Sequence, residues 1–273
     1  MKDTILYNFD NAKINILLRI HILSIPIYIL HFMFSILKKE LIAYFGTLSG
    51  YIIIGIFLII NGLFLWLLPG EYNIADAGYA NVNGLFQLAP WLFLFLCPAI
   101  TMKAFTDEKQ NGTWDLLITK PLRLWDIILG KYFAAFVIVF ASLIPTLIYY
   151  FTVSYIAEPQ GNIDSGQFWG SYTGLLFLSL IYLAIGIFAS TVTTNQIVAF
   201  VLAAVISFSM LYGFDLAVSF ISNLKLVDFI QSLGINAHYS SVSRGVIDSR
   251  DIIYFVIVAG LFLLLTKTKL RLK

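Results

Sequence analysis

The carboxylates that could act together lie in one segment, residues 103–131. Asp107 and Glu108 are adjacent, and Asp115 follows shortly after them. Paired carboxylates can transfer protons or bind a cation, but such a site also needs a base or further ligands nearby. The three histidines lie in separate regions without metal-ligand spacing: His21, His31 and His238. The sequence therefore predicts neither a catalytic group nor a metal site.

The sequence also lacks a nucleotide-binding loop. The Walker pattern needs a glycine five residues before a Gly-Lys pair, and a Ser or Thr after it. Gly130-Lys131 is followed by Tyr132, and Trp125 stands where the first glycine belongs. We therefore expect no enzyme active site, no ATPase site in this chain and no cofactor. The single cysteine, Cys97, excludes an internal disulfide.

Composition indicates an integral membrane protein. The 273 residues are 60% apolar and only 12% charged, whereas soluble domains are about half apolar and about a quarter charged. So few charges could not cover a soluble globule. The net charge of +2 is too small to indicate a nucleic-acid partner.

Five stretches are apolar and long enough to cross a bilayer, which takes about 20 residues in a helix. A sixth, 252–266, is slightly short, but Asp251 and Lys267 lie at its edges and a lysine side chain can reach the interface. No charged residue lies between Asp164 and Asp215, so we expect two helices there with a turn at 191–196. The stretches are 49–68, 85–102, 132–157, two within 165–214, and 252–266. They lack the alternation of barrel strands, and helices satisfy their own backbone groups in lipid. The predicted fold class is an all-α integral membrane protein with six transmembrane helices.

The Lys and Arg residues predict the orientation, because they favour the cytoplasmic side. Segment 103–131 has five of them and the tail 267–273 has four, while loops 69–84 and 158–169 have none. Both termini and segment 103–131 are therefore expected in the cytoplasm. The long loop 217–250 is then an outer loop.

Residues 1–32 do not belong to any of the six predicted spans. Residues 1–32 carry Lys and Arg and then an apolar run that is too short to span. A signal peptide is an alternative, but no small-residue cleavage site follows. We hypothesise that 1–32 is a peripheral extension or that translation starts at Met33, so that 33–273 is one six-span domain. Residues 34–46 predict an interfacial amphipathic helix, with a continuation of the first span as the alternative.

Segment 103–131 carries the most functional information. Gly112 can break a helix, Thr113 can cap the next one, and Pro121 ends it, which predicts a short helix over 113–119. Trp114, Leu117 and Ile118 would be costly to expose there, so the segment predicts a protein docking site. The alternative is a solvated run of charges.

This segment resembles a motif of the permease subunits of type-2 ABC exporters, E-E-x-x-x-G-T-x-E-L-L-L-T-x-P after the second span. Here it stands as DEKQNGTWDLLITKP, from Asp107 to Pro121. The changes are Asp for Glu at the first and ninth positions and Ile for Leu at the twelfth. The first two spans are most similar to those of gliding-motility-associated ABC permease subunits.

The resemblance implies a type-2 ABC exporter permease fold, with an interfacial helix before six spans. It also implies a bacterial inner-membrane protein in which 103–131 couples to a separate ATPase. Glu108 would face basic groups of that ATPase, and Leu116 and Leu117 would pack in the interface or against the interfacial helix. The implied coupling residues are Asp107, Glu108, Gly112, Thr113, Asp115, Leu116, Leu117 and Pro121.

The implied partners are an ABC ATPase subunit, a second permease chain in a homo- or heterodimer, and a membrane subunit with a periplasmic domain. Membrane lipid is a further partner. Two other functions stay open on the residues alone. A secondary transporter or channel would be expected to show an inverted repeat or charges within the membrane. A lipid-modifying enzyme would need clustered His, Asp or Glu residues at the interface.

Overall fold

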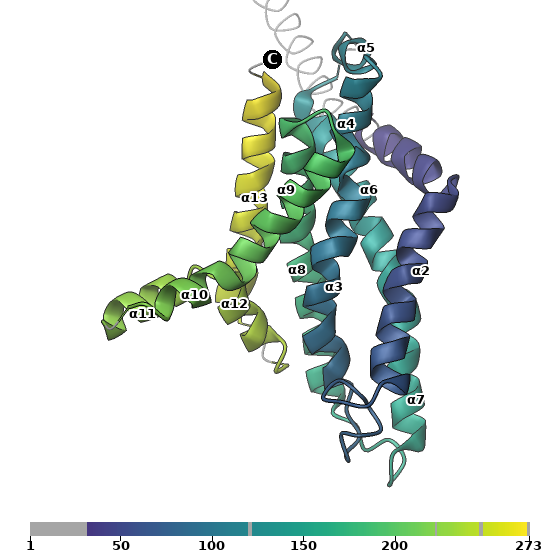
Figure 1. Cartoon of the computed structure of the whole chain (residues 1–273). Helices are drawn as coiled ribbons and strands as arrows, with labels where there is room; N and C mark the ends of the chain where they lie inside the picture. Colours follow the sequence, from purple (N-terminus) through teal and green to yellow (C-terminus); the bar gives the residue numbers. More distant parts are fainter. Residues whose placement is uncertain (1–31, 120–121, 222, 246–247, 272–273) are drawn as a thin grey trace, which may run out of the picture.

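The structure is a computed structural model that describes residues 32–119, 122–221, 223–245 and 248–271 (Figure 1). All regular elements in these ranges are helices. Six helices or runs of helices are long and apolar enough to cross a membrane. They are Leu48–Leu67, Asn83–Gln110, Leu124–Ile156, Ser165–Val192, Gln196–Val218 and Ser249–Arg271. The predicted all-α fold with six spans is confirmed.

Several spans contain more than one helical segment. The first joins α2 (Leu48–Gly62) to the π-helical turn η1 (Leu63–Leu67), and the second joins α3 (Asn83–Thr101) to α4 (Lys103–Gln110). The third contains α6 (Leu124–Leu143), η2 (Ile144–Thr146) and α7 (Leu147–Ile156). Its helix tightens to a 3-10 turn at η2, where Pro145 lacks the backbone N–H that an α-helix uses.

The remaining spans are α8 (Ser165–Val192), a run of α9, η3 and α10, and α13 (Ser249–Arg271). In the fifth span, α9 is Gln196–Phe208, η3 is Ser209–Gly213 and α10 is Phe214–Val218. Helices α11 (Leu224–Gln231) and α12 (Ile235–Val242) lie in the predicted outer loop. Helices α10 and α11 project sideways from the bundle, and α12 turns back toward α8 (Figure 1).

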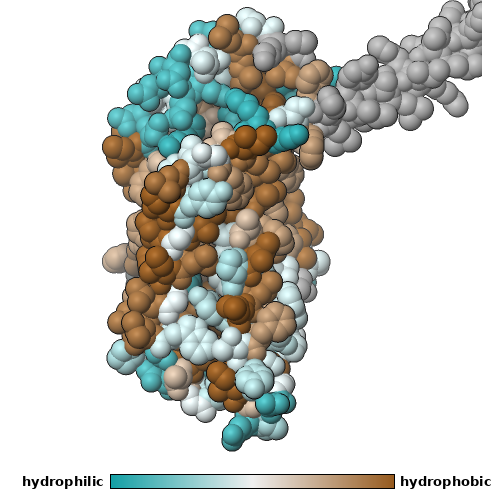
Figure 2. Space-filling view, turned by 90° about the vertical axis from the view of Figure 1, so that its right-hand side faces the viewer, coloured by the Kyte–Doolittle hydropathy of each residue, from teal (hydrophilic) through white to brown (hydrophobic). Residues whose placement is uncertain are grey.

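The core is built around α8, which packs against α3, α6, α9 and α13. Close approach of α8 to α3 depends on Gly186, because a Cβ there would lie 2.0 Å from Oγ1 of Thr101. Tyr182 is fully buried on the same helix. A small residue such as Gly186 allows membrane helices to pack closely without a hydrophobic driving force between them. Figure 2 shows the result on one face, a broad hydrophobic band between two hydrophilic ends.

A separate helix precedes the first span. Residues 32–45 are helical, and the chain changes direction at Gly46 and Thr47 before α2 begins (Figure 1). Thr47 is extended, with ψ of 143°. This helix is therefore not a continuation of the first span. The hypothesis about residues 1–32 lies almost entirely outside the described residues.

Two spans extend beyond their predicted limits and include charged residues. The second span continues as α4 past Lys103, so the segment expected as a loop starts as a helix. The third begins at Leu124 rather than at 132 and includes Asp126 and Lys131. Asp126 helps to start α6, because its Oδ2 accepts a hydrogen bond from the N–H of Arg123 at 3.2 Å. Both extensions lie at the same end of the bundle.

Candidate functional site

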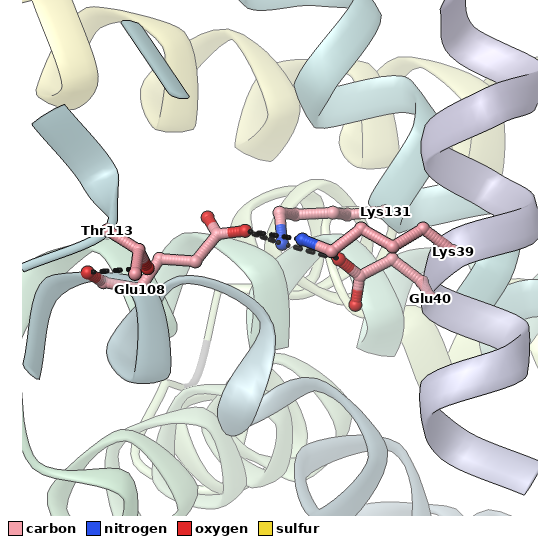
Figure 3. Close-up of polar contacts among 5 residues, drawn as sticks. All are labelled: Lys39, Glu40, Glu108, Thr113 and Lys131. Atoms are coloured by element: carbon pink, nitrogen blue, oxygen red, sulfur yellow. Dashed lines mark hydrogen bonds and ion pairs between the residues drawn. The ribbon is translucent and has the colours of Figure 1, made fainter. Parts of the chain in front are cut away.

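The turn between α4 and α5 (Trp114–Ile118) depends on Gly112. Its φ is +68°, a left-handed conformation that side chains with a Cβ disfavour. Thr113 occupies the position before α5, but its hydroxyl caps nothing in that helix. It donates instead to the carbonyl oxygen of Glu108 at 3.3 Å, back at the end of α4 (Figure 3). The two helices are therefore joined in a fixed, tight turn.

Helix α5 has two different sides at the end of the molecule. Trp114 is buried, with only 6% of its surface exposed, whereas Leu116 is 66% exposed and Ile118 is 49% exposed. Leu117 is partly buried and packs against the core. Asp115 lies in the first turn, where a carboxylate is favoured by the helix dipole. The Trp114 side of α5 thus packs in the bundle. The other side, with Leu116 and Ile118, is an exposed apolar surface that we call the tip of α5.

A cluster of four charged residues, Lys39, Glu40, Glu108 and Lys131, lies beside the turn between α4 and α5 (Figure 3). Nζ of Lys131 on α6 donates to Oε1 of Glu40 on helix 32–45 at 2.8 Å and to Oε1 of Glu108 on α4 at 2.9 Å. Lys39 approaches the same oxygen of Glu108 at 3.5 Å. The Lys131 side chain is only 3% exposed. A buried cation needs such partners, because burial of an unpaired charge is costly.

An aromatic contact joins this cluster to α5. Nζ of Lys131 lies 5.2 Å from the centre of the Phe105 ring, in a cation–π arrangement. The Phe105 ring in turn packs edge-on against Trp114, with 5.7 Å between the ring centres. Phe105 is fully buried. Phe105 therefore connects Trp114 to the ammonium group of Lys131.

Helix α4 is also tied to the turn between α8 and α9. Oδ1 of Asp107 accepts a hydrogen bond from Nε2 of Gln196 at 2.5 Å. Nζ of Lys109 donates to the backbone carbonyl oxygen of Thr191. These contacts connect α4 to two further spans. The α4–α5 segment thus contacts helix 32–45, α6 and the α8–α9 turn.

Gly130 allows helix 32–45 to pack closely against α6 beside Lys131. A Cβ at this glycine would lie 2.9 Å from the side chain of Ile36 and 3.0 Å from the carbonyl oxygen of Met33. Only a glycine leaves room for this crossing of α6 and helix 32–45. The crossing places Glu40 beside Lys131, the residue that follows Gly130.

A known family matches most of the chain. Residues 73–267 match the family described as ABC-2 family transporter protein. The chain belongs to the ABC-2 transporter family. No curated protein matches it. Members of this family are membrane components of transporters, and membership implies partnership with an ABC ATPase subunit. The matched range of this ABC-2 permease includes α4, α5 and Lys131 but not helix 32–45.

In this ABC-2 permease, some of the predicted site residues lie close together and others lie apart. Asp107 and Glu108 face groups of their own chain, so the basic groups that contact Glu108 here are Lys39 and Lys131. Asp115 and Leu116 lie at the exposed tip. Pro121 lies outside the described residues.

Sequence reasoning missed Glu40 and Lys131. Glu40 lies in the predicted interfacial helix and turns toward Lys131 on α6. The available signal was the pair Gly130-Lys131, a small residue followed by a cation inside an otherwise apolar helix.

Proposed function

We propose that this ABC-2 permease is the membrane subunit of an ATP-driven transporter and that the tip of α5 docks on a separate ATPase subunit. The observation that carries the proposal is the division of α5 into two sides. Trp114 is fixed in the bundle, while Leu116 and Ile118 are exposed beyond its charged end. An apolar tip with a neighbouring carboxylate, Asp115, is a surface that a protein partner would cover.

The contacts of α5 suggest how the ATPase would act on the permease. A movement of α5 would pass through Trp114 and Phe105 to Lys131 on α6. Through Glu40 it would also reach helix 32–45, and through Asp107 the α8–α9 turn. ATP would be hydrolysed in the partner. The role of this chain is to convert closure of the ATPase into tilting of its spans.

We further propose the assembly and its surroundings. The α4–α5 end would face the cytoplasm of a bacterial inner membrane, with both termini on that side, because the Lys and Arg residues gather there. Two permease chains and two ATPase chains would form the unit. The least buried spans, which begin with α2 and α9, offer faces for a second permease. A role in gliding motility, with a periplasmic-domain subunit as companion, is supported by sequence resemblance.

Co-purification from native membranes tests the docking. The tagged chain is compared with a double variant, Leu116→Asp with Ile118→Asp, which changes only exposed side chains. We expect an ABC ATPase to co-purify with the wild type and to be lost from the double variant. The matched control is Leu68→Asp, which is also an exposed leucine, 43% exposed, after the end of η1.

The outcomes separate docking from folding. Loss of the ATPase from the double variant but not from Leu68→Asp, at equal membrane levels, supports docking through α5. If all three proteins retain the ATPase equally, the contact lies elsewhere. If no ATPase co-purifies with any of them, a self-contained transporter or channel becomes the better explanation.

A further inference from the structure

A cavity of about 300 Å³ lies beside the Lys131 cluster, between helix 32–45, α2, α3, α4, α6 and α8. This volume is at the lower end of the range for small-molecule sites, about 300–1,000 Å³. The lining is charged at the α4 end. Deeper in the bundle it is apolar, and Ile53, Ile138 and Ile187 contribute to it. The cavity therefore has the same polar-to-apolar direction as a lipid molecule in one leaflet.

Small side chains line the apolar part, which we call the slot. Ala99 and Ala104 line it from the second span, and Ala134 and Ala135 line it from α6. Alanines leave space between helices that larger side chains would fill. The neighbouring α2 exposes several isoleucines on its outer surface: Ile52, Ile56 and Ile59. An acyl chain could enter the slot and continue along α2.

The charged part has equal numbers of cations and carboxylates. Its lining residues are Lys39, Lys103 and Lys131 with Glu40, Asp107 and Glu108. Lys131 is buried between Glu40 and Glu108, whereas Lys39 and Lys103 are exposed. Long lysine side chains of this kind reach the headgroup level while their stems remain in apolar surroundings. The balance favours a headgroup that carries one charge of each sign.

Two buried oxygen atoms of the lining have no partner among the described residues. They are Oε2 of Glu108 and the hydroxyl oxygen of Tyr44. Burial raises the pKa of Tyr44, so its hydroxyl stays protonated. Buried polar atoms without a hydrogen bond are uncommon, because each one is costly. Both oxygens can accept a hydrogen bond, and an N–H donor that displaces the side chains covering them would satisfy them.

We propose that this cavity binds a phospholipid with a primary ammonium headgroup, of the phosphatidylethanolamine type, from the leaflet at the α4 end. The phosphate lies between Lys39 and Lys103, and the ammonium donates to Glu108 and Tyr44. One acyl chain occupies the alanine-lined slot. A choline headgroup lacks N–H donors and a glycerol headgroup lacks the cation, so neither completes the site. This lipid site does not depend on the ATPase partnership.

Native mass spectrometry of the purified full chain tests the proposal. The chain in mild detergent is mixed with equal amounts of phosphatidylethanolamine, phosphatidylcholine and phosphatidylglycerol, and the retained lipids are counted. We expect the ethanolamine lipid to be retained several-fold over the other two. Ala99→Leu, which fills the slot, and Lys103→Gln, which removes an exposed cation, should each lower this retention several-fold. Tyr44→Phe should reduce the preference for ethanolamine over choline.

Matched controls keep the test decisive if a variant folds poorly. Lys38→Gln removes a neighbouring exposed lysine that does not line the cavity, and Ala217→Leu adds the same volume on α10. Both should retain the lipid as the wild type does. Equal retention of all three lipids, or unchanged retention in both Ala99→Leu and Lys103→Gln, would overturn the proposal.

Discussion

Lys131 on α6 and Glu108 on α4 form an ion pair at 2.9 Å, with the lysine side chain only 3% exposed. Glu40 on helix 32–45 approaches the same ammonium group at 2.8 Å. One cation thus joins three helices that are far apart in the sequence. Because Phe105 links this ammonium group to Trp114, the pair lies between the exposed tip of α5 and the membrane-spanning helices.

Replacing Lys131 by Met should strongly destabilise the protein. The change leaves Glu40 and Glu108 close together, and only the exposed Lys39 remains to compensate them. Removal of one partner from a buried ion pair costs about 3–5 kcal/mol. We expect a loss near the lower limit, since the Glu40 side chain is 25% exposed and Lys39 remains beside Glu108. Thermal unfolding in detergent measures the change.

Two further variants test the cause. Lys38→Met removes an exposed lysine of the same helix and should change the unfolding temperature very little. Adding Glu108→Gln to Lys131→Met removes a charge that the first change left unpaired, so the double variant should be more stable than Lys131→Met alone. An additive loss in the double variant would show that the two groups are not coupled.

Replacing Gly112 by Ala should cost about 1–2 kcal/mol, because a Cβ is strained in the left-handed conformation. Apart from its chain neighbours, no atom of the described residues lies within 4 Å of the position of that Cβ, so the cost comes from the backbone alone. Gly112→Asn should cost less, since Asn tolerates this conformation. Gly55→Ala, in the middle of α2 with equally open surroundings, should be neutral or slightly stabilising. Equal losses at Gly112 and Gly55 in thermal unfolding would contradict this account.

The sequence was sufficient to predict the membrane fold, because hydropathy and length decide which segments can span a bilayer. It predicted the turn at Gly112 for a similar reason, since local backbone chemistry decides that feature. The first and last residues of the spans were predicted less accurately. The helices at Lys103 and Lys131 continue through charged residues, and those charges are satisfied by partners distant in the sequence, such as Glu40.

The direction of each side chain at the site could not be predicted. Asp107 and Glu108 look alike in the sequence, yet one binds Gln196 and the other binds Lys131. His238 showed no partner by spacing, but its Nδ1 lies 2.6 Å from Oδ1 of Asp251. These pairs depend on how the helices pack, and a local pattern carries no information about that packing.

Replacing Gly186 by Ala tests the packing of α8 on α3. The added Cβ would lie 2.0 Å from Oγ1 and 2.9 Å from Cβ of Thr101, a residue that is only 1% exposed. Overpacking of this kind costs about 1–3 kcal/mol. Thr101→Ala should recover part of the loss when it is added to Gly186→Ala. Gly260→Ala, where a Cβ meets open space, is the control. A similar unfolding temperature for Gly186→Ala and Gly260→Ala would disprove close packing at this site.

The last prediction separates the two sides of α5. Trp114→Ala removes a buried ring and its contact with Phe105, so it should lower stability by about 3 kcal/mol. Leu116→Asp changes an exposed side chain and should leave the unfolding temperature nearly unchanged, while it abolishes co-purification of the ATPase. Trp114→Phe should largely preserve both properties. Because the two sides have different partners, the two effects should separate: a Leu116→Asp protein that unfolds as readily as Trp114→Ala would mean that Leu116 belongs to the core of the permease rather than to its docking surface.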